Sequence, residues 1–202
     1  TRILLRKAKD TLDERQYKNL ENIQLSADHL LALINDILDL NRIEAGRIEL
    51  QIEPVDLKKL VTECAAAMEP LLQPGVALRQ QLEDLTPLRT DADRLRRVLM
   101  NLLSNAVKFT EKGSITISAR SVDGAVELAV ADTGIGIPAA DLPYIFDEFR
   151  QSGRRGEGEK QGSGLGLTIA RKSVELLGGS IAVESAVGKG TKFTLRIRDY
   201  GG

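Results

Sequence analysis

The stretch from Gln16 to Ala45 contains neither glycine nor proline, and its apolar residues recur at spacings of three and four. The repeat consists of Leu20, Ile23, Ala27, Leu30, Ile34 and Ile37. This heptad-like pattern predicts one long helix with an apolar seam, on the order of 45 Å in length. Leu33, Leu38 and Leu40 widen the seam beyond the needs of a two-helix contact, and Gly46 is typical of a helix end.

A second helix is expected before the long one. Residues 1–9 are predicted to be the end of that helix, residues 10–13 the connection, and Asp13 the N-cap of the long helix. Two helices from one chain cannot bury so wide a stripe, so we expect a second copy of the chain to complete a four-helix bundle. Residues 1–46 are therefore predicted to form a dimerising helical hairpin whose first helix is truncated.

The rest of the chain alternates between strand and helix signals. Strands are predicted at 48–52, 76–82, 114–120, 125–131, 181–184 and 193–197, and helices at 56–67, 91–108 and 165–177. Hairpin turns are expected at 123–124 and 188–190. This order predicts an α+β chain in which residues 47–202 form an α/β sandwich, with a mixed, largely antiparallel sheet and helices on one face.

Composition excludes several classes of protein. The chain carries 28 Lys and Arg against 29 Asp and Glu, so a nucleic-acid partner is not expected. No apolar run approaches the roughly 18 residues needed to span a bilayer, and any membrane attachment would have to come from segments outside this sequence. The single cysteine, Cys64, excludes an internal disulfide and fits a reducing compartment, so a cytoplasmic location is expected.

A polar stripe runs along the predicted helix at 91–108. Asn101, Asn105 and Lys108 fall at positions i, i+4 and i+7, which places them on one side of the helix. An amide oxygen is a hard ligand suited to Mg²⁺, and a lysine supplies a point charge for phosphate. The alternative is an ordinary solvated helix surface, which is the commoner explanation for such a stripe taken alone.

A second polar group follows the predicted strand at 125–131. Asp132 comes at the end of that strand, and Gly134 and Gly136 allow the backbone to approach a flat ligand closely. An ionised carboxylate only accepts hydrogen bonds, so Asp132 could take the exocyclic amine of adenine. A plain tight turn is the alternative, because a lone Gly-x-Gly is weak support for a ligand site.

Residues 162–167 (GSGLGL) open the last predicted helix. Backbone N–H groups at a helix N-terminus favour anions, so these glycines suit a phosphate cradle, although the Gly-Lys-Ser/Thr ending of a P-loop is missing. The glycine-rich segment 152–166 has the composition of a mobile lid or of a plain linker. In residues 188–191 (GKGT), the hydroxyl of Thr191 could reach the same ligand.

The order of these motifs resembles that of the sensor histidine kinases of two-component signalling. Residues 101–110 (NLLSNAVKFT) are similar to the N box, 132–137 (DTGIGI) to the G1 box and 146–149 (FDEF) to the F box. Residues 162–167 and 188–191 resemble the G2 and G3 boxes. Residues 29–46 (HLLALINDILDLNRIEAG) resemble the second helix of the dimerisation and phosphotransfer bundle, so the resemblance covers essentially the whole chain.

The resemblance implies the ATP-binding sandwich shared with gyrase, mismatch-repair and heat-shock chaperone ATPases. It implies that Asn105 binds Mg²⁺ with the support of Asn101, and that Lys108 contacts phosphate. It further implies that Asp132 recognises the adenine amine and that Thr191 assists near the base. The remaining implied ATP-site positions, which serve close backbone approach, the phosphates and the lid hinge, are Gly134, Gly136, Gly162, Gly164, Leu165 and Gly166.

The resemblance also implies a nucleotide lid anchored by Phe146 and Phe149, although both residues could equally be core aromatics. A lid cation is expected after the F box, where Arg150 stands. The implied reaction is transfer of the γ-phosphoryl group of Mg-ATP to a histidine, for relay to an aspartate in the receiver domain of a response regulator. The implied cofactors are ATP and Mg²⁺, and the implied partners are a second copy of the chain and that receiver domain.

The acceptor motif of the family, His-Glu-x-x-x-Pro, is absent from this sequence. His29 is the only histidine, but it falls in the segment that resembles the second bundle helix, so a structural or solvated role is favoured. The acceptor segment is therefore expected to lie outside this chain, which should not phosphorylate itself. Two alternatives remain open: an ATPase of the same superfamily, disfavoured because Asn101 replaces the usual glutamate base, and an acceptor-less nucleotide-binding or dimerisation module.

Overall fold

We describe residues 13–85, 88–150 and 163–200 of a computed structural model, in which the chain divides into two compact units, Thr1–Ala45 and Gly46–Gly202. The predicted long helix is confirmed as α2 (Glu14–Glu44). Asp13 caps it as predicted, in a capping box with Gln16. Gly46, with φ of +60°, follows the helix end. The predicted first helix lies outside the described residues.

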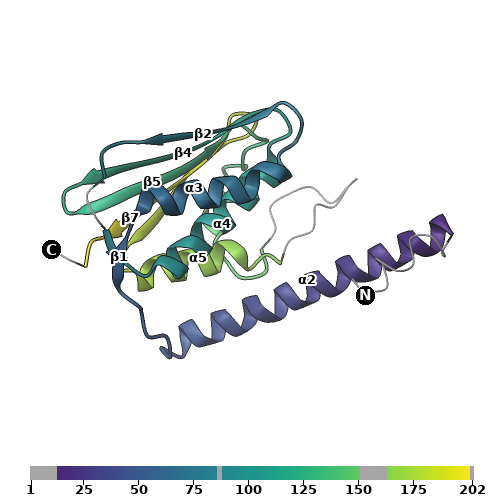
Figure 1. Ribbon diagram of the computed structural model, residues 1–202, viewed down its shortest axis with the longest axis horizontal. Coiled ribbons are helices and arrows are strands. Elements are labelled where there is room, and N and C mark those ends of the chain that lie inside the picture. The colour runs from purple at the N-terminus through teal and green to yellow at the C-terminus, as the bar shows by residue number, and fades with distance from the viewer. Residues whose placement is uncertain (1–12, 86–87, 151–162, 201–202) are drawn as a thin grey trace. The chain divides into compact units, whose positions relative to one another are not determined.

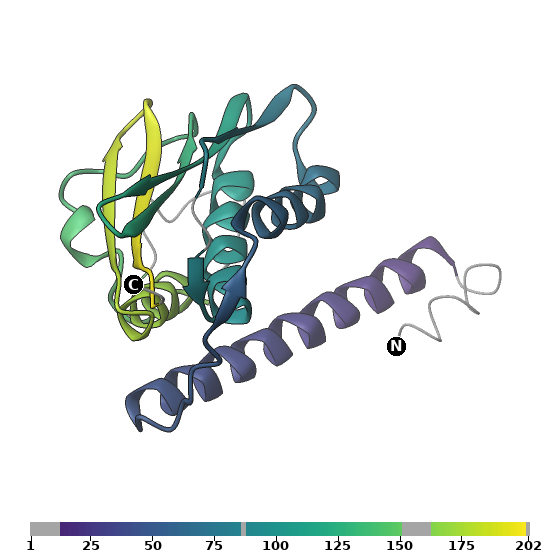
Figure 2. The same cartoon turned by 60° about the vertical axis from the view of Figure 1, so that its left-hand side comes forward.

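The second unit is built on a five-stranded mixed sheet (Figures 1 and 2). Its order is β2-β4-β5-β7-β6. The strands are β2 (Val76–Leu82), β4 (Gly113–Val122), β5 (Ala125–Asp132), β6 (Ser180–Ala186) and β7 (Gly190–Arg198). Only the β2–β4 pair is parallel, so the predicted mixed, largely antiparallel sheet is confirmed.

Helices cover one face of this sheet (Figure 2). They are α3 (Leu57–Met68), α4 (Ala92–Phe109) and α5 (Gly166–Leu176), and two short 3-10 turns, Glu69–Leu71 and Leu142–Tyr144, complete the described helical elements. Asp56 caps α3 and Asp91 caps α4. Leucine side chains of α4 and inward-facing side chains of β4, β5 and β7 are buried together, which gives the domain its core.

The predicted strand at 48–52 is wrong. The strand instead is β1 (Glu53–Val55), which contains Pro54 and pairs with β3 (Leu88–Thr90), a strand that the sequence analysis missed. Pro54 lies opposite Arg89, whose N–H donates to Asp199 Oδ1 and whose carbonyl accepts from Tyr200. Arg89 therefore turns its backbone groups away from β1, and the missing N–H of Pro54 costs no ladder bond.

No helix in the described ranges combines the length and the apolar character needed to cross a bilayer.

Candidate functional site

Asp132 stands at the end of β5, directly opposite Thr191 of β7. Its Oδ1 accepts the backbone N–H groups of Gly134 at 2.8 Å and Thr191 at 3.2 Å. Burial raises the pKa of Asp132 above its usual value, and these two hydrogen bonds only partly oppose that effect. Within the described residues nothing donates to Oδ2, so one carboxylate oxygen remains an open acceptor at a partly buried position.

Ser185 is a further candidate site residue, which no motif in the sequence predicts. Its hydroxyl accepts from the Ile137 N–H at 2.8 Å, donates to the Gly190 carbonyl at 2.8 Å and lies 2.9 Å from Thr191 Oγ1. Because the Ser185 proton is used on Gly190, the Thr191 hydroxyl must donate to Ser185 and keeps its own lone pairs. The register of the β6–β7 hairpin, in which Ser185 faces Thr191, is the signal that could have found it.

The loop at 132–137 is held from both sides. On the helix side, the Ile135 N–H donates to the carbonyl of Phe109 at the end of α4, 3.2 Å away. On the hairpin side, the Gly188 N–H donates to the Ile135 carbonyl at 2.8 Å. The loop is therefore a fixed link between α4 and the β6–β7 hairpin rather than a free turn.

We expect Gly136→Ala to destabilise the domain by more than about 3 kcal/mol, because a Cβ at that position would run into the backbone of Ala186 in addition to the strain of a positive φ. Gly124→Ala is the matched control: its φ of +69° equals the +70° of Gly136 within a degree, but its Cβ would meet open space. Urea denaturation of Gly124→Ala should show only the strain, about 1–2 kcal/mol. Equal losses for the two variants would contradict a close-packed loop.

The polar stripe of α4 ends beside this loop. Asn105 donates its side-chain amide to Asn101 Oδ1 at 3.3 Å, and Oδ1 of Asn105 receives no hydrogen bond from the described residues. The Lys108 ammonium lies 5.0 Å from the centre of the Phe109 ring. Phe109, which follows Lys108 at the end of α4, accepts the hydrogen bond from the loop, so the C-terminal end of the stripe lies next to the loop that follows Asp132.

The N-terminus of α5 meets the other end of the stripe. Gly166 packs so closely on Asn101 that a Cβ there would clash with the asparagine amide. Leu165 is fully buried and anchors the start of the helix, and its N–H is held by Ser163 Oγ at 3.2 Å. The N-cap residue of this helix, Leu165, supplies no side-chain hydrogen bond to it. Gly162 and most of the predicted lid, residues 152–162, lie outside the described residues.

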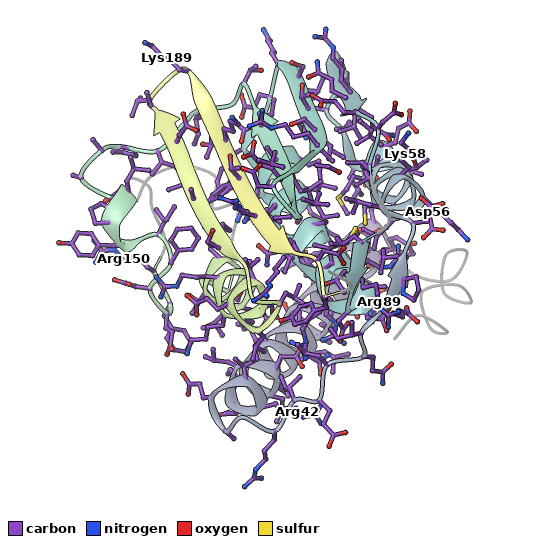
Figure 3. All side chains as sticks on the ribbon, turned by 90° about the vertical axis from the view of Figure 1, so that its left-hand side faces the viewer. Arg42, Asp56, Lys58, Arg89, Arg150 and Lys189 are labelled. Carbon is purple, nitrogen blue, oxygen red and sulfur yellow. The ribbon has the colours of Figure 1, made fainter. Side chains whose placement is uncertain are left out.

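Phe146 and Phe149 have different surroundings. Phe146 is buried and packs edge-on against Phe193, and its carbonyl accepts a hydrogen bond from the Thr168 hydroxyl at 2.8 Å. Phe149 is 63% exposed and adopts φ of +58°, so the alternative of a core aromatic is wrong for it. Gly164 lies against the Phe149 backbone, and Arg150 (labelled in Figure 3) stacks on the Tyr144 ring at 4.9 Å.

Residues 90–201 match the family described as "Histidine kinase-, DNA gyrase B-, and HSP90-like ATPase", and residues 1–46 match the "His Kinase A (phospho-acceptor) domain". The chain belongs to the histidine kinase family. The family and fold class predicted from the motifs are thereby confirmed. The catalytic-domain match contains α4, the loop at 132–137 and the β6–β7 hairpin, so the polar groups described above all fall within it.

Relatives of this histidine kinase chain carry kinase names. It is 43% identical over 200 residues to the circadian input-output histidine kinase CikA of Synechococcus elongatus, and 40% identical over 192 residues to the histidine protein kinase DivJ of Caulobacter vibrioides. These alignments cover 96% and 92% of the chain but only 26% and 32% of the relatives. The chain therefore spans between about a quarter and a third of each of those proteins.

Solved histidine kinase structures share its fold. Full-length ShkA in complex with AMPPNP matches with a TM-score of 0.82 and 33% identity, over 95% of this chain and 40% of that one. Acinetobacter baumannii AdeS matches with a TM-score of 0.74 and 25% identity, over 98% of this chain and 95% of that one.

Proposed function

We propose that this chain is the dimerising and catalytic core of a two-component histidine kinase, and that it binds Mg-ATP on α4. The observation that carries the proposal is the convergence of two separate elements on α4, one at each end of its polar stripe. The loop after Asp132 bonds the C-terminal end of α4, and the N-terminus of α5 packs on Asn101. In this assignment residues 1–46 dimerise and residues 47–202 bind the nucleotide.

The base would bind at Asp132. Its Oδ2 is an acceptor that receives no hydrogen bond from the described residues, and an adenine amine is a donor of matching chemistry. Thr191 keeps hydroxyl lone pairs beside this carboxylate, so it supplies a second acceptor for the base or for a bridging water. Gly134 lacks a side chain, and a Cβ there would run into the Phe109 carbonyl at the end of α4 and into Asp132 Oδ1.

The phosphates and the metal would bind farther along α4. Within the described residues no cluster of three His, Cys, Asp or Glu side chains could hold a metal ion. The Oδ1 of Asn105 receives no hydrogen bond from the described part of the chain, and a hard oxygen of this kind could complete a Mg²⁺ shell made mostly of phosphate oxygens and water. Bound Mg²⁺ would neutralise charge on the transferring phosphoryl group. Lys108 and the N-terminus of α5, whose N-cap residue Leu165 supplies no side-chain hydrogen bond, would add positive charge for the phosphates.

The same stripe favours a kinase over a hydrolase. Asn101 occupies the position where ATPases of this superfamily place a glutamate, and an amide has no ionisable group with which to activate water. His29 lies within α2, in the segment that resembles the second bundle helix, so we do not assign it as the phosphoacceptor. The acceptor is a histidine on the other bundle helix, and the downstream partner is the receiver domain of a response regulator.

The test uses calorimetry and radiolabelled ATP. The chain should bind Mg-ATP at one site. When extended at its N-terminus by a helix that carries an acceptor histidine, it should retain an acid-labile label from the γ-phosphate. Release of free phosphate without labelling would support an ATPase instead. Binding without either reaction would support an acceptor-less module, and no binding would refute the site.

The apolar seam of α2 supports the dimer. Within this unit Leu30 is 59% exposed and Ile34 46% exposed, although both belong to the predicted seam. We expect Ile34→Lys to weaken the dimer at least about 100-fold, because symmetry removes two isoleucines worth about 1.5–3 kcal/mol each. Ala32→Lys, outside the seam on the same helix, should leave the dimer intact in light scattering. A dimer that is equally stable with both substitutions would contradict packing through this seam.

A further inference from the structure

The segment that leads into β1, residues 47–52, makes few hydrogen bonds. Residues 47–52 form neither helix nor strand, and within the described residues they make one hydrogen bond, from the Gln51 N–H to Asp91 Oδ2 at 3.1 Å. Leu50 adds an apolar contact with the core. Apart from such apolar contacts, the hydrogen bond that orders this segment comes from a single carboxylate.

Asp91 serves two elements at once. Its Oδ1 accepts the Arg94 N–H at 2.9 Å and so caps α4, while its Oδ2 holds the connecting segment forty positions earlier in the chain. The residue is only 8% exposed. A buried carboxylate that uses a separate oxygen for each element ties them together more firmly than a surface cap would, because either lost bond leaves a partner unsatisfied.

The position of Asp91 in the fold strengthens this tie. It follows β3 directly, and β3 pairs with β1, the strand into which the connecting segment runs. It also begins α4, whose polar stripe carries the nucleotide site proposed above. One side chain thus joins the segment at residues 47–52 to the helix that would bind Mg-ATP.

We propose that Asp91 is a positioning residue that couples the order of residues 47–52 to nucleotide occupancy of α4. The inference rests on the proposed function. A nucleotide that holds α4 against the 132–137 loop and α5 also fixes the N-terminal end of the helix, where Asp91 receives the Gln51 N–H. By linkage, an ordered segment in turn favours the nucleotide-bound arrangement.

Amide hydrogen exchange at Gln51 tests the coupling in the whole chain, with and without Mg-ATP. In the wild type, nucleotide should slow exchange of this amide. Asp91→Asn keeps an oxygen for the cap but turns an amide donor toward Gln51. It should speed Gln51 exchange at least about tenfold, the size expected for one hydrogen bond to a carboxylate, and abolish the nucleotide effect. ATP affinity in calorimetry should change less than the Gln51 exchange rate.

Two further variants make the result specific. Asp91→Ser retains a capping hydroxyl without a second oxygen, so it should reproduce the Asn result without repulsion from an amide. Asp56→Asn is the matched control, because Asp56 (labelled in Figure 3) caps α3 through Lys59 and has no described bond to the connecting segment. This variant should leave Gln51 exchange unchanged.

The outcomes separate the two proposals. Normal Mg-ATP binding with unchanged Gln51 exchange in Asp91→Asn overturns the coupling alone and leaves Asp91 as a simple cap. Normal Mg-ATP binding also overturns the coupling alone if nucleotide still slows Gln51 exchange in both Asp91 variants. Failure of the wild type to bind Mg-ATP overturns the proposed function, and the coupling with it.

Discussion

Replacement of Asp132 by asparagine is expected to weaken Mg-ATP binding about 100-fold or more without weakening the fold. The amide oxygen of the variant can still accept the N–H groups of Gly134 and Thr191. Its amide nitrogen, however, replaces the open acceptor with a donor, which would face the adenine amine. The side-chain amide and the adenine amine are both donors, so neither would find a partner in the buried site. Unpaired buried donors greatly reduce binding affinity in a site that recognises its ligand by hydrogen bonds.

The same variant should change how stability depends on pH. Burial raises the pKa of Asp132, so the folded chain binds this proton more readily than the unfolded chain does. The contribution of Asp132 to stability is therefore complete below the ordinary carboxyl pKa and is lost as pH rises through the raised pKa. Asparagine does not ionise and escapes this loss. The variant should match or exceed the wild type in stability at neutral pH and lose that advantage in acid.

Calorimetric titration with Mg-ATP and urea denaturation at several pH values measure the two effects. Asp123→Asn is the control, because it makes the same chemical change in the turn at the other end of the β4–β5 hairpin. It should leave Mg-ATP affinity within about twofold of the wild type. Unchanged affinity in Asp132→Asn would refute the assignment of the base to this carboxylate.

Replacement of Asn105 by alanine is expected to remove the part of the ATP affinity that depends on Mg²⁺. The variant loses the side-chain Oδ1 and the hydrogen bond to Asn101, which would leave a metal ion short of a protein ligand. Affinity measured with Mg²⁺ should fall about 100-fold, toward the value measured with a chelator. The helix itself should survive, because alanine is a better helix former than asparagine.

Titrations with Mg²⁺ and with a chelator, on the same protein, separate the metal from the nucleotide. Ser104→Ala is the control, since Ser104 is the exposed neighbour of Asn105 on the same helix. Its affinity should remain Mg²⁺-dependent like that of the wild type. If Asn105→Ala keeps the full difference between the two titrations, the metal is held elsewhere.

Much of the fold could be predicted from the sequence because its signals are local. The heptad seam and the Asp13 cap predicted α2, and alternation predicted β4 and β5 with the Asp123 turn between them. The prediction of a strand at 48–52 is wrong because the alternating apolar residues there pack along the core without pairing with another described strand. β3 is three residues long, too short to show a period, and it exists only because β1 and the residues 199–200 bond to it.

The chemistry of the chain was already present in its sequence: an amide stripe on one helix, a carboxylate at a strand end, and glycines where backbones meet. Only the tertiary structure decided which partner each group serves. It gave Asp132 two donors on one oxygen, brought Ser185 to Thr191, and joined Asp91 to Gln51. The physical reason is that spacing along a chain determines which face of an element a side chain occupies. Strand register and helix packing determine what that face meets, and both depend on residues far away in sequence.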